Sequence, residues 1–420
     1  MKNMFLLLVL SAVLFSCSKD ADDTDSGLQN FTVVLNVDPN YRFSEFTKSF
    51  HAFLSDQNGT ILDSAEMQIG QSATLKFTGE PSTVYDLSYM YYANVDIVGE
   101  EFYTLITFTN IKNGVYTIGP SPCIENTHDE IYINLDNTGY PCEVTSSTSN
   151  SGTFGPENGG YYKFRGNLAA SPISDIYVSF KSPNDQFDRY FWRQAVPEGS
   201  VFNIDYNTLP EIQNIVNVQS PSNTIFGFGL EGLVNDDNNE IHHSIREGNY
   251  SSGNASLSIP VPTNVFDSYI FRLSFGNDNF QYFRKLRTTT IPNNVAVPGQ
   301  SFIVNNQSPA NFSMTINGNA ILYDVIFRGT NASETISVAH QVYGEVATEV
   351  SFSKENLRKN IQATYSDLTG FETLPLGSVT LTNFSFINSY KDVLRYKIQG
   401  RDYVMPELNG FYEGTSKQFD

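Results

Sequence analysis

Residues 51–62 read HAFLSDQNGTIL, and this stretch decides the fold class. Two short apolar runs flank Asn58-Gly59, a dipeptide that is the strongest short-range hairpin signal because both residues tolerate a positive φ. Further strand-like runs follow at 73–77, 84–92, 101–108 and 115–118. Short strands separated by turns at regular spacing predict a β-sandwich domain of immunoglobulin-like size.

The composition extends this prediction to the whole chain. Of 420 residues, 40% are hydrophobic, with 32 Phe and 24 Tyr, which is too apolar for a disordered acidic chain. Helix-forming blocks are absent, so we predict an all-β fold of tandem β-sandwich (immunoglobulin-like) domains. The 45 acidic residues outnumber the 25 basic ones, and the net charge of −20 disfavours nucleic acid as a partner.

The first residues predict a secretory signal peptide. Lys2 precedes an apolar run, residues 5–15, that is too short to span a bilayer comfortably. Residues 14–17, LFSC, resemble the lipobox of bacterial lipoproteins. That resemblance implies cleavage before Cys17 and acylation of Cys17, and the lipid bilayer then becomes a partner of the mature protein.

The residues after Cys17 resemble the acidic tether of Bacteroidota lipoproteins on the outer face of the outer membrane. Residues 18–23 read SKDADD, and few apolar side chains occur up to residue 30. The resemblance implies an outer-membrane protein that faces the cell exterior. A charged spacer of this kind would hold the folded part away from the lipid.

We predict the following division of the chain. Residues 1–16 are the signal peptide, 17–30 the lipidated cysteine and tether, 31–144 a β-sandwich, 145–160 a Ser/Thr/Gly-rich linker, and 161–264 and 265–420 two related β domains. The relation between the two β domains is inferred from short similar segments: VPEGSVF at 196–202 is similar to VPGQSF at 297–302. Chance similarity in a β-rich sequence is the alternative. One helix is predicted over 354–362, because Leu357 and Ile361 lie four apart on one face and Ser353 can cap it.

Two cysteines remain once Cys17 is lipidated. Cys123 and Cys142 form an even pair in an oxidising compartment, where a disulfide is the default expectation. Metal ligation or a thiol nucleophile is the alternative, but neither cysteine has Cys-x-x-Cys spacing.

Two sequence patterns resemble ligand motifs. Residues 227–232, GFGLEG, match the dinucleotide fingerprint G-x-G-x-x-G, but they continue as a strand and do not open a helix, so no nucleotide is expected. Residues 235–240, NDDNNE, and the adjacent His242 and His243 are rich in metal ligands. They lack the regular calcium-loop spacing, so a solvated hairpin tip is favoured over a structural Ca²⁺, and no cofactor or catalytic metal is predicted.

Aromatic side chains are the candidate ligand-binding residues. Tyr85, Tyr89 and Tyr91 alternate on one strand face, and Tyr190 and Trp192 belong to a second dense patch. Exposed rings of this kind stack on the apolar faces of sugars. Core packing is the alternative for each patch.

No catalytic motif is recognisable in the sequence. The five histidines are scattered, and neither H-E-x-x-H nor G-x-S-x-G occurs. A glycoside hydrolase needs only two carboxylates that are neighbours in space, so it stays open as an alternative. Residues 63–65, DSA, resemble the O-glycosylation motif of Bacteroidota secreted proteins, with Ser64 as the acceptor.

We therefore predict a surface-anchored, non-enzymatic lipoprotein whose β modules bind a polymer such as a glycan. Its layout is similar to that of the accessory lipoproteins of starch-utilisation systems, although no binding motif is shared. A structural or adhesive surface protein without a small ligand is the first alternative, and a glycoside hydrolase is the second.

Overall fold

The computed structural model describes most of the chain after residue 26. The described residues are 27–41, 47–80, 83–95, 100–119, 128–136, 144–146, 153–157, 161–167, 173–181, 187–197, 199–221, 224–234, 242–249, 256–277, 279–399 and 406–419. Strands dominate these residues, and the all-β prediction is confirmed.

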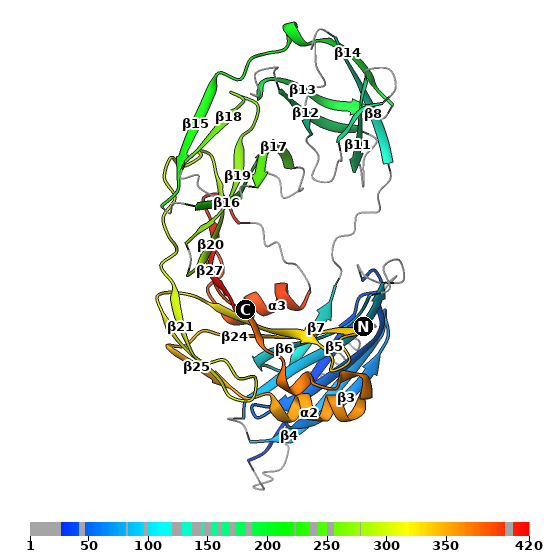
Figure 1. Cartoon of the computed structure of the whole chain (residues 1–420). Coiled ribbons are helices and arrows are strands. Elements are labelled where there is room, and N and C mark those ends of the chain that lie inside the picture. The colour runs from blue at the N-terminus through cyan, green and yellow to red at the C-terminus, as the bar shows by residue number, and fades with distance from the viewer. Residues whose placement is uncertain are drawn as a thin grey trace, which may run out of the picture.

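One twelve-stranded sheet runs through the molecule (Figure 1). Its strands, in spatial order, are β17 (His242–Asn249), β16 (Thr224–Leu233), β19 (Ser268–Gly276), β20 (Gln281–Thr288), β27 (Phe411–Gln418), β26 (Leu376–Phe384), β23 (Leu322–Thr330), β24 (Ile336–Glu345), β6 (Glu100–Ile111), β5 (Tyr85–Val95), β2 (Thr47–Asp56) and β3 (Ile61–Met67). All neighbours are antiparallel except β24 and β6, which are parallel.

Five smaller sheets complete the described strands. They are β4 (Ser72–Gly79), β1 (Gln29–Val37) and β7 (Gly114–Ile118); β10 (Thr153–Glu157), β11 (Tyr161–Asn167), β8 (His128–Asp136) and β14 (Val201–Asp205); β13 (Phe187–Pro197), β12 (Ile173–Lys181) and β9 (Val144–Ser146); β15 (Asn214–Gln219) and β18 (Ser256–Val261); and β21 (Ser301–Asn306), β22 (Phe312–Asn317) and β25 (Glu349–Phe352).

The described helices are short. Two are α-helices, α2 (Glu355–Thr364) and α3 (Tyr390–Ile398), and three are single 3₁₀ turns, η2 (Tyr206–Thr208), η3 (Ser366–Leu368) and η4 (Phe371–Thr373). The prediction of α2 is confirmed, but its cap is Lys354 and not Ser353. The helix α3 was not predicted; Ser389 caps it by accepting a hydrogen bond from the Asp392 N–H at 3.2 Å.

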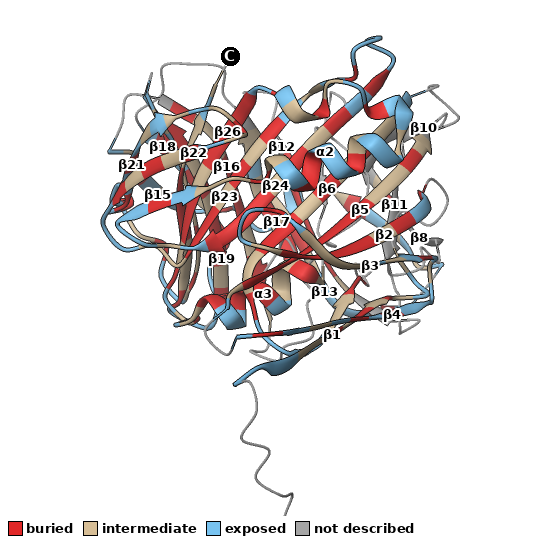
Figure 2. Ribbon diagram, turned by 90° about the horizontal axis from the view of Figure 1, so that it is seen from below, coloured by how far each residue is buried: buried red, intermediate tan, exposed pale blue. Residues whose placement is uncertain are grey.

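Both faces of the large sheet are covered where it contains β2. Phe50, Ala52 and Leu54 pack into a core with the β4-β1-β7 sheet and α3, whereas Phe53 packs into a second core with β22, β25 and α2. Figure 2 shows α2 lying across the sheet with its buried side turned inward. A strand that is buried on both faces needs a nearly continuous apolar run, which explains the sequence HAFL.

The opposite end of the large sheet has its own core. Phe228 and Leu230 of β16 and Leu273 of β19 pack with Val218 and Leu257 from the β15-β18 ribbon. A fourth cluster joins β8, β12, β13 and β14, at the top of Figure 1.

The predicted hairpin at Asn58-Gly59 is confirmed, since β2 and β3 pair antiparallel on either side of it and Gly59 has φ of 78°. The predicted domain ranges 31–144, 161–264 and 265–420 stay predictions of how the chain divides. The large sheet contains strands from all three ranges, because β24 pairs with β6 and β16 pairs with β19.

Candidate functional site

A pocket of about 500 Å³ lies where the β2–β3 turn, β5 and β6 meet β22, β23, β25 and the start of α2; we call it the junction pocket. Its walls combine three aromatic residues with eight neutral polar ones and a single ion pair. The lining residues are Gln57, Asn58, Val84, Asp86, Thr109, Asn110, Asn311, Phe312, Ser313, Tyr323, Ser351, Phe352, Ser353 and Lys354.

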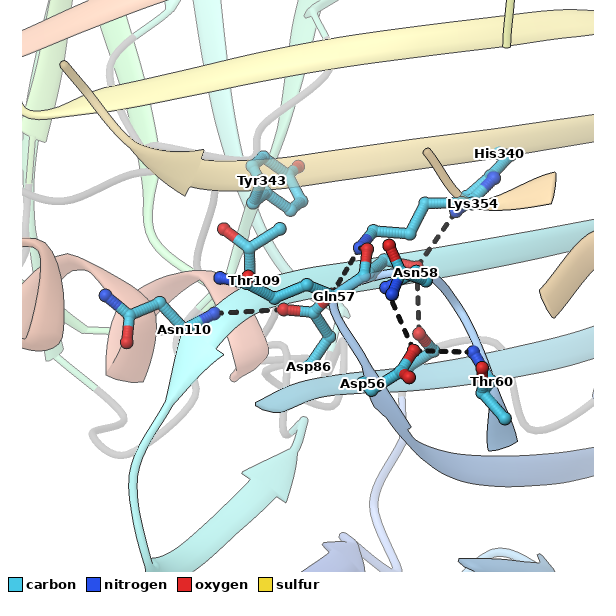
Figure 3. Close-up of polar contacts among 12 residues, drawn as sticks. Asp56, Gln57, Asn58, Thr60, Asp86, Thr109, Asn110, His340, Tyr343 and Lys354 are labelled. Carbon is cyan, nitrogen blue, oxygen red and sulfur yellow. Dashed lines mark hydrogen bonds and ion pairs between the residues drawn. The ribbon is translucent and has the colours of Figure 1, made fainter. Parts of the chain in front are cut away.

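The β2–β3 turn sets one rim of the junction pocket. The Asp56 carboxylate accepts hydrogen bonds from the N–H groups of Asn58 at 2.9 Å and Thr60 at 2.8 Å, which fixes the turn (Figure 3). Gly59 is needed here, because a Cβ would lie 2.9 Å from the backbone nitrogen of Leu357 in α2. The hairpin signal in the sequence therefore also places Asn58 at the mouth of the pocket.

A buried ion pair forms the floor of the junction pocket. The Lys354 ammonium pairs with the Asp86 carboxylate and donates to the Gln57 carbonyl at 2.8 Å, and the side chains of Lys354 and Asp86 are 2% and 1% exposed (Figure 3). The Asn110 N–H donates to the other Asp86 oxygen at 3.1 Å. Burial raises the pKa of Asp86, and the Lys354 charge opposes that rise.

A chain of buried hydrogen bonds lies behind this floor. Arg358 Nε donates to His340 Nδ1 at 2.8 Å, so His340 Nε2 carries the proton and donates to the Thr107 hydroxyl at 2.9 Å. Thr107 in turn bonds Ser88 at 2.8 Å. Burial, with the Arg358 and Lys354 charges, holds the pKa of His340 well below its ordinary value. The neutral imidazole thus links α2 to the sheet.

The aromatic wall of the junction pocket consists of packed rings. Phe352 stacks on the buried Phe312 with centroids 4.9 Å apart and lies nearly parallel to Tyr323 at 6.3 Å. Phe352 is half-buried, so part of its ring remains accessible. Such a ring beside neutral polar groups suits the apolar face and the hydroxyls of a sugar.

Two polar groups of the junction pocket retain hydrogen-bonding capacity. Asn110 Oδ1 is buried and has no hydrogen-bond partner among the described residues. Lys354 makes two hydrogen bonds from an ammonium that carries three donors. Asp86 is the one carboxylate among the described lining residues, so the two convergent acids of a glycoside hydrolase are not brought together there.

The structure places the predicted tyrosines of β5 in or against the core. Tyr85 and Tyr89 are 3% and 5% exposed, and the half-buried Tyr91 packs against the same cluster. Tyr85 lies against Phe31, with ring centroids 4.4 Å apart. The core-packing alternative therefore describes this face, which leaves little ring surface for a sugar.

Trp192 and Tyr190 of β13 lie at the other end of the molecule and are half-buried. Trp192 meets His243 at 5.1 Å and Phe266 at 5.7 Å edge-on, and Tyr190 stacks on Tyr177 at 5.9 Å. Both pack against the core of β16 and β19. Neither lines the junction pocket.

Several other predictions fall outside the described residues or remain untested. Cys17, Cys123, Cys142 and the run 235–240 lie outside them. Ser64 is exposed on β3, as a glycosylation acceptor must be. Within the described part, no group of His, Cys, Asp and Glu could hold a metal ion, and no helix is long and apolar enough to cross a membrane. Residues 227–232 lie on strand β16, as expected for a false nucleotide motif.

The residues of the junction pocket were not predicted as a site from the sequence. Asp86 and Lys354 are 268 positions apart and belong to no recognisable spacing. One signal was available: Asp86 is the one charged residue of the mostly apolar strand β5, and a buried charge within a strand needs a partner. Nothing in the sequence indicates which partner.

Comparisons with known proteins do not name a family. No protein-family model and no curated protein matches the chain. Among solved structures, the SGBP-B protein of the Bacteroides ovatus mixed-linkage glucan utilization locus, in complex with a mixed-linkage heptasaccharide, is 10% identical over 96% of this chain and 98% of its own, with a TM-score of 0.11.

Two fimbrial proteins are similarly remote. A fimbrial assembly protein from Parabacteroides distasonis is 10% identical over 69% of this chain and 96% of its own, with a TM-score of 0.10. The tip fimbrial protein of Porphyromonas gingivalis is 9% identical over 77% and 100%, with a TM-score of 0.11. TM-scores this low do not establish a shared fold, so the function is inferred from the residues themselves.

Proposed function

We propose that the protein is a non-enzymatic, surface-anchored lipoprotein that binds a neutral, hydroxyl-rich polymer, a glycan, in the junction pocket. The observation that carries this proposal is the lining of the pocket, in which neutral amides and hydroxyls surround a half-buried aromatic ring. Sugars are recognised by this combination, since their ring faces are apolar and their edges carry hydroxyls.

The anchor in this proposal is acylated Cys17. A lipid on that residue would hold the β domains at the outer membrane, and the tether up to residue 30 would separate them from the bilayer. Cys17→Ser should therefore move the protein from the membrane fraction to the soluble fraction. Membrane association that persists in this variant would contradict the anchor without affecting the binding proposal.

Affinity electrophoresis against a panel of neutral polysaccharides tests the binding. Retardation by at least one polymer that is left intact is the expected result. Phe352→Leu should weaken it, because the ring is lost while an apolar side chain is kept. Phe386→Leu is the matched control, since Phe386 is also half-buried but does not line the pocket.

A second pair of variants tests the amide rim. Asn58→Ala should weaken binding about fivefold, the effect of losing a hydrogen bond worth about 1 kcal/mol. Asn305→Ala should have no effect, since this exposed asparagine of β21 lies outside the pocket. No retardation by any polymer would favour a structural or adhesive protein, and shortening of the polymer would reveal a hydrolase.

A further inference from the structure

A second pocket, of about 610 Å³, lies on one face of the large sheet at β16, β17, β19, β20 and β27; we call it the sheet-face pocket. Its floor is a row of directly paired residues that crosses five strands. The row is Glu247, Gly229, Arg272, Lys285 and Tyr412. Residues that pair directly across neighbouring strands point to the same face, so these side chains share one surface.

The two faces of the sheet differ in what covers them at the sheet-face pocket. Leu273 and Phe228, which alternate with Arg272 and Gly229, point into the core under the β15-β18 ribbon. On the pocket face, Tyr412 packs against the core that contains α3. The pocket therefore begins where the cover provided by α3 ends.

Glycines allow two side chains to lie flat on this face. A Cβ on Gly229 would lie 3.0 Å from Arg272 Nε, and a Cβ on Gly414 would lie 2.2 Å from Phe283 Cζ. The Phe283 ring lies 5.1 Å from the Tyr412 ring, and both are half-buried. Glycine within a strand often marks a place where another group approaches the backbone closely.

Arg272 remains accessible on this surface although an ion pair holds it in place. Arg272 pairs with Glu231, yet its side chain is 40% exposed and its buried Nε has no hydrogen-bond partner among the described residues. A guanidinium has five N–H donors, so one carboxylate does not exhaust it. Lys285, directly opposite Arg272, is 8% exposed and lines the same pocket.

A smaller pocket of about 290 Å³ adjoins this surface and shares Arg284 with it. Arg287 also lines the smaller pocket, and its described lining contains no carboxylate. Arg284 pairs directly with Leu273 and Glu413, so the side chains of Arg284 and Glu413 point to the opposite face of the sheet. On the face of the sheet-face pocket, Arg272, Lys285 and Arg287 are balanced by Glu247 and Glu231, which leaves an excess of 3 − 2 = 1 positive charge.

A local positive excess is unexpected in a chain whose net charge is −20. We propose that the sheet-face pocket binds an acidic saccharide, with its carboxylate or sulfate group held by Arg272 and Lys285 and its ring against Phe283 and Tyr412. Charged hydrogen bonds from guanidinium and ammonium groups are the strong ones, and half-buried aromatic rings provide the apolar contact. This site is separate from the junction pocket and requires no ligand there.

Matched pairs of polymers test the proposal on the full protein. The probes are polygalacturonate against its fully methyl-esterified form, and dextran sulfate against dextran, in affinity electrophoresis. Retardation by an acidic polymer and not by its neutral counterpart is expected. Because the protein is acidic overall, general charge attraction would not produce this result. Equal retardation by both members of each pair, or retardation by neither acidic polymer, would overturn the proposal.

Variants locate the binding on the molecule. Arg272→Gln and Lys285→Gln should each weaken retardation by the acidic polymer about tenfold, a typical effect of losing a charged hydrogen bond. Lys359→Gln is the control, since it removes one positive charge from the exposed face of α2. Full binding by both pocket variants would exclude the site.

A second measurement separates loss of binding from loss of folding. In the double variant E231Q/R272Q no carboxylate is left without its arginine, so the fold should be retained while acidic binding is lost. Retardation by a neutral polymer through the junction pocket, or an unchanged melting temperature, verifies the fold. Phe352→Leu should leave acidic binding unchanged, so the two pockets can fail independently.

Discussion

The junction pocket and the sheet-face pocket both contain charged side chains, but the two sites enclose these charges to different extents. At the junction, Lys354 and Asp86 are at most 2% exposed and bond to each other and to the backbone. On the sheet face, the Arg272 side chain is 40% exposed, although it is paired with Glu231. The charges of the junction floor are thus sealed, whereas Arg272 on the sheet face is open to a ligand although Lys285 beside it is 8% exposed.

This difference separates structural roles from binding roles. A sealed ion pair holds two parts of the chain together, and its loss leaves a charge stranded in the core. An open cation keeps donors for a ligand and contributes little to stability. We therefore expect changes at the junction floor to affect folding, and changes on the sheet face to affect acidic ligands.

Asp86→Ala should have the largest effect. It leaves the Lys354 ammonium buried without its carboxylate, which typically lowers the free energy of unfolding by about 3–5 kcal/mol. Urea unfolding measures the loss. Glu355→Gln breaks the exposed Lys359–Glu355 pair of the neighbouring helix and should change nothing measurable. If both variants lost the same amount, the contrast between sealed and open charges would be wrong.

Gly414→Ala should have the next largest effect, this time on the sheet face. The added Cβ would lie 2.2 Å from Phe283, so the ring must move, and overpacking of this kind lowers stability by about 1–3 kcal/mol. Retardation by an acidic polymer should decrease with it. Gly299→Ala is the control, because nothing lies within 4 Å of a Cβ there. Unchanged binding in Gly414→Ala would remove Phe283 from the proposed site.

Mild acid should weaken the junction and spare the sheet face. His340 stays neutral in the fold because burial and the charges of Arg358 and Lys354 lower its pKa, whereas the unfolded chain takes up a proton below about pH 6.5. Because of His340 the unfolded state then binds more protons, which lowers stability by up to about 1.4 kcal/mol for each unit by which the pH falls. Asp86, whose pKa burial raises, contributes a slope of the opposite sign.

Urea unfolding at a series of pH values from 7 downward measures this slope. His51, whose pKa is also lowered by burial, adds a slope of the same sign, so His340→Gln should remove only part of it. Burial lowers the pKa of Lys285, but acid can only add a proton to its amine, so lowering the pH from 7 removes no positive charge from the sheet face. A slope that is identical in His340→Gln and the parent protein would contradict the role given to His340.

Local sequence signals predicted local structure well. The pattern around Asn58-Gly59 predicted the β2–β3 hairpin, and the spacing of Leu357 and Ile361 predicted α2. The helix α3 was predictable too, since Ser389 and Asp392 have the spacing of a capping box before an amphipathic segment. The sequence was nevertheless interpreted as containing one helix, so α3 was not predicted.

Contacts between distant segments were not predictable from the sequence. The parallel pairing of β24 with β6 joins residues such as His340 and Leu105, and no turn or spacing specifies such a partner. The same holds for Asp86 and Lys354. Alternation predicted correctly that Tyr85 and Tyr89 share a face, but their burial depends on the β4-β1-β7 sheet that covers it.

The sequence contains a clearer signal of the sheet-face pocket than of the junction pocket. Residues 284–287 read RKLR, which places three cations within four positions of an acidic chain. Alternation on a strand predicts that Lys285 and Arg287 share one face and Arg284 the other. The glycines of β16, two strands away from β20 in the sheet, were interpreted from the sequence only as a nucleotide motif, although Gly229 also makes room for the Arg272 side chain.

Added salt should weaken the binding of acidic polymers and leave the binding of neutral polymers unchanged. This is the smallest of the expected effects. Raising the ionic strength from about 0.1 M to about 1 M shortens the Debye length from about 10 Å to about 3 Å, which weakens attraction between exposed charges. Because the Arg272 side chain is 40% exposed, retardation by an acidic polymer should weaken a few-fold. Retardation by a neutral polymer should stay constant, since the hydroxyl and amide contacts of the junction pocket carry no net charge. Equal sensitivity of both polymers to salt would mean that they share one site, and Phe352→Leu and Arg272→Gln would then identify which pocket it is.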